Sequence, residues 1–229
     1  MSTTPAGGNS RSITTNQPGP HEKVPELVVR HLGNDSQKPF NQHTLEAFEQ
    51  VQAWRHQQDP DNSRALILDS CCGVGESTAH IAGMFPDALV VGIDKSAQRT
   101  QKHAHYAEDA GCYQVVRADV NDFWRLAVEA GWQPSHHFLL YPNPYPKSAH
   151  VQRRWHASSA FKYIVQLGGK LEVRSNWDII FKSLPLRCKL PVSKHKLNPT
   201  PHQNRKHLSN ESIGAAGNQA GVYCATYSF

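Results

Sequence analysis

The sequence predicts an α/β fold built on a mostly parallel, doubly wound sheet with helices on both of its faces. Short apolar runs alternate with helix-like segments between residues 65 and 175. An acidic residue lies at the end of three of these runs, and a glycine pair follows the first run. Such alternation is typical of a parallel sheet wrapped by helices. The carboxyl ends of the strands then share one edge, at which ligands bind.

The 229-residue chain is long enough for a single domain of ordinary size. Residues 1–20 are rich in Ser, Thr, Gly, Asn and Pro, so we expect residues 1–35 to be a flexible tail and residues 36–229 to form one domain. No apolar run approaches membrane-spanning length, which argues against an integral membrane protein. The N-terminus also lacks the apolar segment of a secretory signal.

The cysteines and the charge balance indicate the compartment and the kind of partner that we expect for the protein. Five cysteines without a C-x-x-C pair support neither a zinc site nor a disulfide framework, so we expect a cytoplasmic protein without a metal. Lys and Arg number 24 against 19 Asp and Glu, a formal net charge of +5. This balance favours an anionic partner, nucleic acid first. We expect a monomer or a homodimer.

The elements follow in order from the apolar pattern. An apolar stripe at Leu45, Phe48, Val51 and Trp54 predicts a first helix. Apolar runs predict strands at 65–70, 88–94, 113–119, 136–142 and 170–175, and residues 221–229 have the composition of a further strand. Helix-like segments lie at 78–85, 95–111, 121–131 and 158–169, whereas residues 193–212 are polar, basic and loop-like.

The segment "LILDSCCGVGES" places Gly73 and Gly75 directly after the first predicted strand. Glycines at that point allow a tight turn and a close approach of a ligand to the main chain. Thr78 stands where a dinucleotide-binding pattern has its third glycine. The second strand ends at Asp94, about twenty residues on, where a carboxylate can accept from both hydroxyls of a ribose.

Two further acids complete a ligand hypothesis. Asp119, at the end of the third strand, can accept from an adenine amino group, and Asp69, near the loop, can orient an ammonium group. A ribose, an adenine and an amino-acid ammonium together describe S-adenosylmethionine, which has no pyrophosphate and so needs no third glycine. The expected cofactor is therefore S-adenosylmethionine, with S-adenosylhomocysteine as product. In the alternative interpretation, these acids only cap helices.

A proline-rich turn follows the fourth strand, beside the expected methyl group. Prolines at 142, 144 and 146 restrict the backbone around Asn143 and Tyr145. The Asn143 amide offers a donor and an acceptor to a base edge, and Tyr145 can lie against a base. The alternative is a rigid, solvated turn before a basic helix. The residues expected to hold RNA phosphates, or a base in the case of the histidine, are Lys147, His150, Arg153 and Arg154.

The run Pro142–Lys147, "PNPYPK", with the basic residues after it, resembles the bacterial tRNA (guanine-N7)-methyltransferases. Their signature is Pro-Asp-Pro-Trp-Pro-Lys followed by a basic run that ends in Arg-Arg. The resemblance extends from about Ala65 to Trp177. It implies a Rossmann-like class I methyltransferase fold, S-adenosylmethionine as donor, and methylation of a guanine N7 in the tRNA variable loop.

By position, the resemblance also implies roles for single residues. Asn143 takes the catalytic position. Cofactor binding is carried onto Asp69, Asp94, Asp119 and Asn143, in addition to the glycines at 73 and 75. Substrate binding is carried onto Lys147 and Asn176.

The sequence departs from the family pattern in three places. Asn143 replaces the family's Asp, Ser175-Asn176-Trp177 replaces Thr-Asp-Trp, and the C-terminal Thr-x-Phe-Glu element is not recognisable in residues 201–221. Guanine N7 carries a lone pair and needs no proton removed, so catalysis is chiefly a matter of positioning. An amide can still orient the base by donating to O6. We therefore expect an active enzyme whose preference for its substrate is weaker or altered.

Two other functions remain open. "NPYP" is similar to the Asn-Pro-Pro-Tyr motif of amino-group methyltransferases, in which the asparagine holds an exocyclic amine. Alternatively, the lost acids and the missing C-terminal element fit a non-catalytic paralogue that binds RNA.

Overall fold

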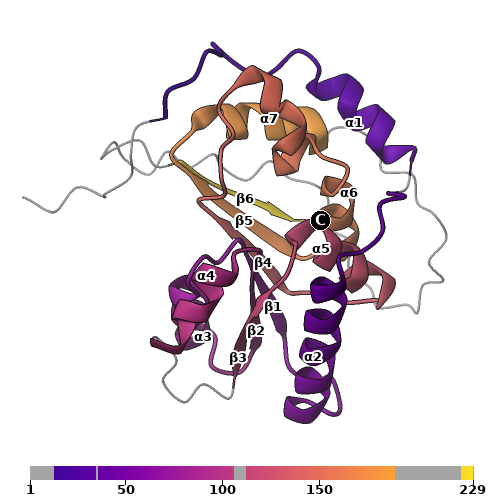
Figure 1. Ribbon diagram of the computed structural model, residues 1–229, viewed down its shortest axis with the longest axis vertical. Helices are drawn as coiled ribbons and strands as arrows, with labels where there is room; N and C mark the ends of the chain where they lie inside the picture. Colours follow the sequence, from indigo (N-terminus) through magenta and orange to yellow (C-terminus); the bar gives the residue numbers. More distant parts are fainter. Residues whose placement is uncertain (1–12, 35, 106–111, 189–222, 229) are drawn as a thin grey trace, which may run out of the picture.

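The computed structural model describes residues 13–34, 36–105, 112–188 and 223–228. Its centre is a six-stranded sheet in the order β3-β2-β1-β4-β5-β6 (Figure 1). The strands are β1 (Leu66–Ser70), β2 (Leu89–Asp94), β3 (Tyr113–Arg117), β4 (His136–Leu140), β5 (Lys170–Ser175) and β6 (Tyr223–Ser228). The first five run parallel, whereas β6 pairs antiparallel with β5. This confirms the predicted mostly parallel α/β fold.

Helices cover both faces of the sheet (Figure 1). They are α1 (Val24–Leu32), α2 (Gln42–Gln58), α3 (Glu76–Met84), α4 (Ala97–Thr100), α5 (Val120–Glu129), α6 (Phe161–Leu167) and α7 (Asp178–Cys188), with 3-10 turns η1 (Gln101–His105), η2 (Ser148–Arg153) and η3 (Trp155–Ala157). Within the described part of the chain, no helix has the length and apolar character needed to cross a bilayer.

Two apolar layers hold the helices on the sheet. The larger lies on the side of α2, α5, α6 and α7 and includes Phe48, Phe123 and Ile164. The smaller lies under α3 and includes Ile81 and Phe138. Because β1 and β2 lie between the layers, all of their residues are buried, which explains their continuous apolar sequence.

Most predicted elements are confirmed, with differences at both ends of the chain. The segment predicted as a flexible tail contains α1, whose Val24, Leu27 and Val28 are buried with Val151 and Ala157. That part of the prediction is wrong, because these apolar residues recur at helical spacing behind a polar start.

Three other segments complete the comparison. The helix expected at 95–111 is instead the short α4 followed by η1, and residues 106–111 lie outside the described residues. The predicted loop at 193–212 also lies outside them. Helix α7 was not predicted.

Candidate functional site

The candidate site lies at the switch point of the sheet, where β1 has β2 on one side and β4 on the other. Strands β1 and β4 pair in register, with Ser70 opposite Leu139, so the segments that follow them leave the same edge. In open α/β sheets this crevice is where ligands bind. The side chains of Ser70 and His137 join the two strands through a 2.8 Å hydrogen bond. Burial lowers the pKa of His137 to about 3, so the imidazole remains neutral.

The loop after β1 has the backbone conformation that its glycines allow. Gly73 and Gly75 have φ angles of 64° and 85°, in the left-handed region. A Cβ added at Gly75 would lie 2.4 Å from Nδ1 of His103, whereas one added at Gly73 would meet nothing within 4 Å. Gly73 therefore faces open space in which a ligand can approach the main chain, as a nucleoside cofactor requires.

Cys71 shares the left-handed conformation, with φ of 66°, although it is not a glycine. Burial, with the nearby Asp94 and Asp69 charges, raises the pKa of the Cys71 thiol to about 12. Burial likewise raises the pKa of Cys72. These raised pKa values favour the protonated thiols at neutral pH, which argues against a nucleophilic role for either cysteine.

Asp94 ties the end of β2 to the glycine loop. Its Oδ2 accepts from the Gly73 amide at 3.1 Å and its Oδ1 accepts from the Ser96 amide at 2.8 Å. Asp94 is 5% exposed, and Nη1 of Arg99 lies 3.8 Å from Oδ2. Since each carboxylate oxygen has a second acceptor position, Asp94 retains the capacity to accept from ribose hydroxyls.

Asp69 is fully buried between β1 and α3. Its Oδ2 accepts from Oγ of Ser77 at 2.6 Å and from Oγ1 of Thr78 at 2.8 Å. Its Oδ1 has no partner among the described residues. Burial raises the pKa of this carboxyl, while the two hydroxyls oppose that shift. An unpartnered buried carboxylate oxygen beside the loop fits a cationic group such as the ammonium of S-adenosylmethionine.

Asp119 is the N-cap of α5, because its Oδ1 accepts from the Asn121 amide at 3.0 Å. Its own amide donates to Oγ1 of Thr44 at 3.0 Å, which fixes α2 to the end of β3. The helix-capping interpretation thus holds for one oxygen of Asp119. The other oxygen of this half-buried side chain remains for a ligand.

Thr78 stands where a dinucleotide-binding pattern has its third glycine, yet α3 still packs closely on β2 at this point. A Cβ at Gly92 on β2 would lie 2.3 Å from Oγ1 and 2.9 Å from Cγ2 of Thr78. The glycine that permits close contact between helix and strand is therefore on the strand rather than on the helix. Sequence reasoning missed this pair, although the glycine inside the apolar run at 88–94 was a signal for close approach.

The proline turn follows β4 at the same edge. Oδ1 of Asn143 accepts from the Tyr145 amide at 3.3 Å, and the Asn143 side chain is exposed. Tyr141 and Tyr145 have φ angles of 50° and 46°, which non-glycine residues rarely adopt. The Tyr145 ring meets the His150 ring edge to face at 6.3 Å. The turn thus leaves the Asn143 side chain at the surface, with its oxygen bonded to the Tyr145 amide.

The basic residues after the turn divide into two groups. Lys147 and Arg153 are exposed and His150 is half-buried. Arg154, predicted to hold phosphate, is 1% exposed. Its Nε donates to the Tyr145 carbonyl and its Nη2 to the Lys147 carbonyl, each at 3.2 Å.

The prediction for Arg154 is therefore wrong in this structure. Its guanidinium lies 4.7 Å from the ring centroid of Trp177, and burial lowers its pKa to about 10. The sequence gives no sign of which arginine in the adjacent pair points inward. The distinction arises because η2 ends at Arg153 and the chain then extends.

Asn176 leaves the end of β5, the strand next to β4, so it lies at the same edge but one strand further from the glycine loop. It is half-buried, and the amide of the following Trp177 donates to Oγ of Ser175 at 3.1 Å. Residues 201–221 lie outside the described residues.

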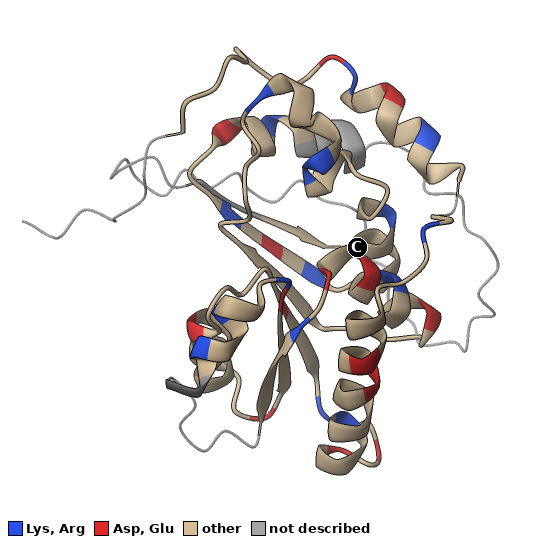
Figure 2. Ribbon diagram, in the orientation of Figure 1, with Lys and Arg blue, Asp and Glu red and all other residues tan. Residues whose placement is uncertain are grey.

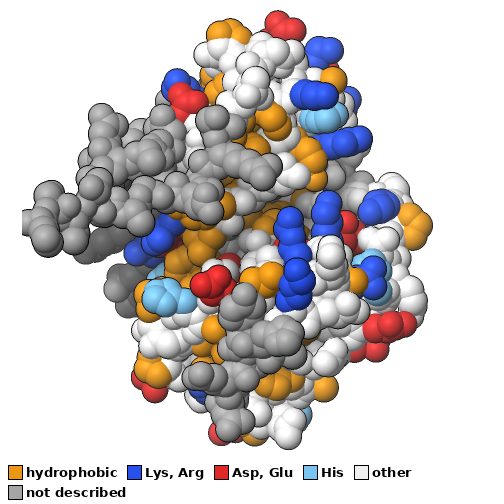
Figure 3. All heavy atoms as spheres, turned by 60° about the vertical axis from the view of Figure 1, so that its left-hand side comes forward, with side chains coloured by type: hydrophobic (Ala, Val, Ile, Leu, Met, Phe, Trp, Pro, Cys, Tyr) orange, Lys and Arg blue, Asp and Glu red, His pale blue; other side chains and the backbone are white. Residues whose placement is uncertain are grey.

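The surface around the site is uneven in charge. Figure 2 shows acidic positions along α2, which carries Glu46 and Glu49. On the face shown in Figure 3, Lys and Arg side chains gather beside exposed apolar side chains. In the part of the chain that the structure describes, no group of three or more His, Cys, Asp or Glu is placed to hold a metal ion.

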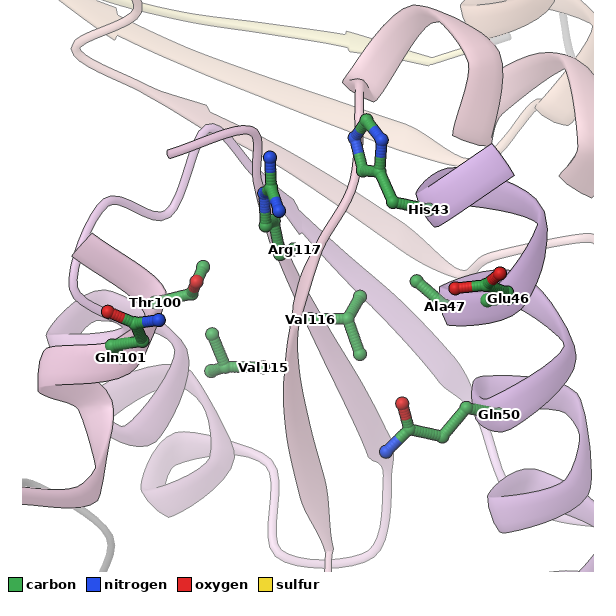
Figure 4. A pocket seen from close by; sticks show the side chains of 9 residues that line it. All are labelled: His43, Glu46, Ala47, Gln50, Thr100, Gln101, Val115, Val116 and Arg117. Carbon is green, nitrogen blue, oxygen red and sulfur yellow. The ribbon is translucent and has the colours of Figure 1, made fainter. Parts of the chain in front are cut away.

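Two hollows lie elsewhere on the molecule. One, of about 360 Å³, follows the outer edge of β3 between α2 and α4, with His43 and Arg117 among its lining residues (Figure 4). The other, of about 570 Å³, lies near the start of β1 and is lined by Arg55, Arg64 and Trp132, among others. Neither includes the glycine loop or the proline turn.

Comparison with known proteins supports a methyltransferase family. Over 92 residues the chain is 33% identical to a trans-aconitate 2-methyltransferase of Deinococcus radiodurans, covering 35% of this chain and 33% of that protein. The corresponding protein of Methylobacterium radiotolerans is 34% identical over 88 residues, with 35% and 33% covered. The match thus spans about a third of each of these curated relatives.

Solved structures with similarity include the aminoglycoside resistance methyltransferase NpmB1, at 19% identity and a TM-score of 0.43, covering 63% of this chain and 71% of that one. An rRNA methylase from Streptococcus thermophilus has 13% identity and a TM-score of 0.43, with 77% and 93% covered. Residues 63–211 match the Methyltransf_4 family model, whose description is that of a methyltransferase. Since that match spans more than half of the 229 residues, the chain belongs to the Methyltransf_4 family of methyltransferases.

Proposed function

We propose that the protein transfers a methyl group from S-adenosylmethionine to N7 of a guanine in the variable loop of tRNA. One observation carries the proposal. The turn that presents Asn143 leaves β4 directly beside β1, whose following loop contains Gly73 and is bonded to Asp94. In this proposal the cofactor and the acceptor base would therefore occupy one crevice of the sheet.

The residues present fit the cofactor. Asp94 would accept from the ribose hydroxyls, the second oxygen of Asp119 from the adenine amino group, and Oδ1 of Asp69 from the ammonium. Gly73 would allow close contact with the main chain because no side chain occupies that space. When bound, S-adenosylmethionine supplies a methyl group on a positively charged sulfur.

Asn143 would orient the guanine. Its Oδ1 is engaged with the Tyr145 amide, so its Nδ2 hydrogens, which have no partner in the described parts of the chain, are available to O6 of a base. Guanine N7 attacks with its own lone pair, and no general base is needed. The geometry of the turn, rather than proton transfer, would then determine the rate.

The RNA backbone would be held by exposed cations. Lys147 and Arg153 lie after the turn on the same edge, with His150 between them. Contacts of this kind set affinity and register and carry no base specificity. Asn176, on the neighbouring strand end, would contact the substrate from the other side of the turn.

The state of Asn143 bears on the amino-group alternative. An amino-group methyltransferase requires the asparagine oxygen as an acceptor for the exocyclic amine. In this structure that oxygen accepts from the Tyr145 amide and keeps a second acceptor position. The amide nitrogen of Asn143 can equally donate to guanine O6, so this contact is compatible with both reactions and the identity of the methylated nucleoside distinguishes them.

Product analysis tests the proposal. Purified protein is incubated with methyl-labelled S-adenosylmethionine and unmodified bulk tRNA, the RNA is digested, and the labelled nucleoside is identified. We expect 7-methylguanosine, and none with Asp94→Ala. Label in an N-methylated base would instead support amino-group transfer. Cofactor binding without RNA labelling would contradict the proposed reaction, and binding of RNA without cofactor would support a non-catalytic paralogue.

A further inference from the structure

An N-terminal strap, defined as residues 13–17, contacts the proline turn although the bonded residues are 131 and 132 positions apart in sequence. Oγ1 of Thr15 donates to the Pro146 carbonyl at 2.9 Å. The Ser148 amide donates to Oδ1 of Asn16 at 3.2 Å. At the start of the strap, Ile13 packs against the main apolar core. The strap is thus anchored on one side and bonded to the turn on the other.

The third contact passes through the buried arginine. Nη2 of Arg154 donates to Oε1 of Gln17 as well as to the Lys147 carbonyl, and its Nε donates to the Tyr145 carbonyl. The strap and Arg154 therefore satisfy the carbonyls of residues 145–147 and the amide of residue 148. The peptide bond between Lys147 and Ser148 is held at its carbonyl from one side and at its amide from the other.

The turn needs such support. Tyr141 and Tyr145 adopt left-handed φ angles, a conformation that is unfavourable for a residue with a Cβ. Conformations of that kind persist only where surrounding contacts enforce them. The Tyr141 amide is held by the Arg174 carbonyl at 2.8 Å, and the His150 amide donates to the Lys147 carbonyl at 2.9 Å. Between these two points, Arg154, the strap and the Asn143 oxygen supply hydrogen bonds to residues 145–148.

We propose that Thr15, Asn16 and Gln17 are positioning residues of the methyl-acceptor site. By fixing the backbone of residues 145–148, they hold Asn143 in the orientation that a base would meet. The strap contacts neither Asp94 nor Gly73 through any described hydrogen bond, so it would act on the acceptor side and not on cofactor affinity. The expected effect on catalysis rests on the proposed function. The hydrogen bonds between the strap and the turn do not depend on that function.

The first test does not depend on catalysis. Trypsin cleavage after Lys147 is followed by mass spectrometry in the wild type and in the triple variant Thr15→Val, Asn16→Ala, Gln17→Ala. We expect cleavage at this bond to accelerate about tenfold or more, because local opening becomes easier. Thr14→Ala is the matched control, since Thr14 is exposed and its side chain makes no hydrogen bond to the described residues of the turn. Equal cleavage rates in wild type and triple variant would overturn the proposal.

The second test measures methyl transfer to tRNA. The triple variant should lose about ten- to a hundredfold in kcat, with the dissociation constant for S-adenosylmethionine within about twofold of wild type and the unfolding midpoint little changed. Gln17→Glu, which keeps the acceptor for Arg154, should retain activity near wild type. Unchanged kcat, or loss of cofactor binding in the triple variant, would contradict a positioning role. If the wild type labels no RNA, the proposed substrate is wrong. The rate of trypsin cleavage after Lys147 then tests by itself whether the strap stabilises the turn.

Discussion

The backbone amide of Gly73 donates a 3.1 Å hydrogen bond to Oδ2 of Asp94. This bond joins the loop after β1 to the acid that ends β2, so the two parts of the expected cofactor site form one unit. The other oxygen of the same carboxylate holds the Ser96 amide at the start of α4. Asp94 therefore organises both segments that would surround a ribose.

Replacing Gly92 with Ala should destabilise the fold. The added methyl would lie 2.3 Å from Oγ1 of Thr78, which is itself bonded to Asp69 and has little freedom to move. We expect a loss of about 1–3 kcal/mol in the free energy of unfolding, measured by urea denaturation. Thr78→Ala in the same chain should recover part of that loss. Strictly additive effects of the two substitutions would show that the contact is not the cause.

Asp69→Asn should change how stability depends on pH. Burial raises the pKa of Asp69 above its ordinary value of 3.8, so the folded state binds this proton more tightly than the unfolded state. Stability from this group is fully present below the ordinary value and is lost as pH rises through the raised folded pKa. The neutral variant escapes this loss, and its unfolding free energy relative to wild type should rise with pH above about 4. If the difference in unfolding free energy between Asp69→Asn and wild type did not change with pH, that result would contradict a raised pKa of Asp69.

Truncation of the adjacent arginines should lower the free energy of unfolding strongly for Arg154 and hardly at all for Arg153. Arg154→Ala removes a donor from the part-buried Tyr145 and Lys147 carbonyls, of which the Lys147 carbonyl keeps the His150 amide at 2.9 Å, and should cost roughly 1–3 kcal/mol of unfolding free energy. Arg153→Ala removes an exposed side chain and should change stability by less than about 0.5 kcal/mol. Chemical denaturation of both variants makes the comparison. A larger loss of unfolding free energy for Arg153→Ala than for Arg154→Ala would contradict the buried, bonded position of Arg154.

Lys147→Ala should weaken RNA binding without affecting the cofactor. The ammonium is exposed beside the turn, where it would contact a phosphate. Removing one phosphate contact should reduce the magnitude of the slope of log affinity against log salt by about 1. Filter binding or fluorescence anisotropy over a salt series measures this, and calorimetry with S-adenosylmethionine serves as the control. An unchanged slope would place Lys147 away from the RNA.

The strands were predictable because burial on both faces demands continuous apolar runs, as at Leu66–Ser70 and Leu89–Asp94. The glycine loop and its acids were predictable because strand ends meet at one edge. Contacts between distant segments were not. Gln17 and Arg154 meet across 137 positions, and no local pattern marks either residue as a partner of the other. The inward direction of Arg154 likewise depends on how η2 ends, which the Arg-Arg pair does not encode.

Cofactor binding by the Asp94 variant tests the central claim most directly. Isothermal titration calorimetry with S-adenosylmethionine would compare the wild type, Asp94→Ala and the control Asp61→Ala, whose exposed carboxylate is in the turn before β1. We predict that Asp94→Ala abolishes measurable binding while Asp61→Ala binds as the wild type does. Equal affinity in Asp94→Ala and wild type would contradict a cofactor site at the carboxyl edge of β1 and β2.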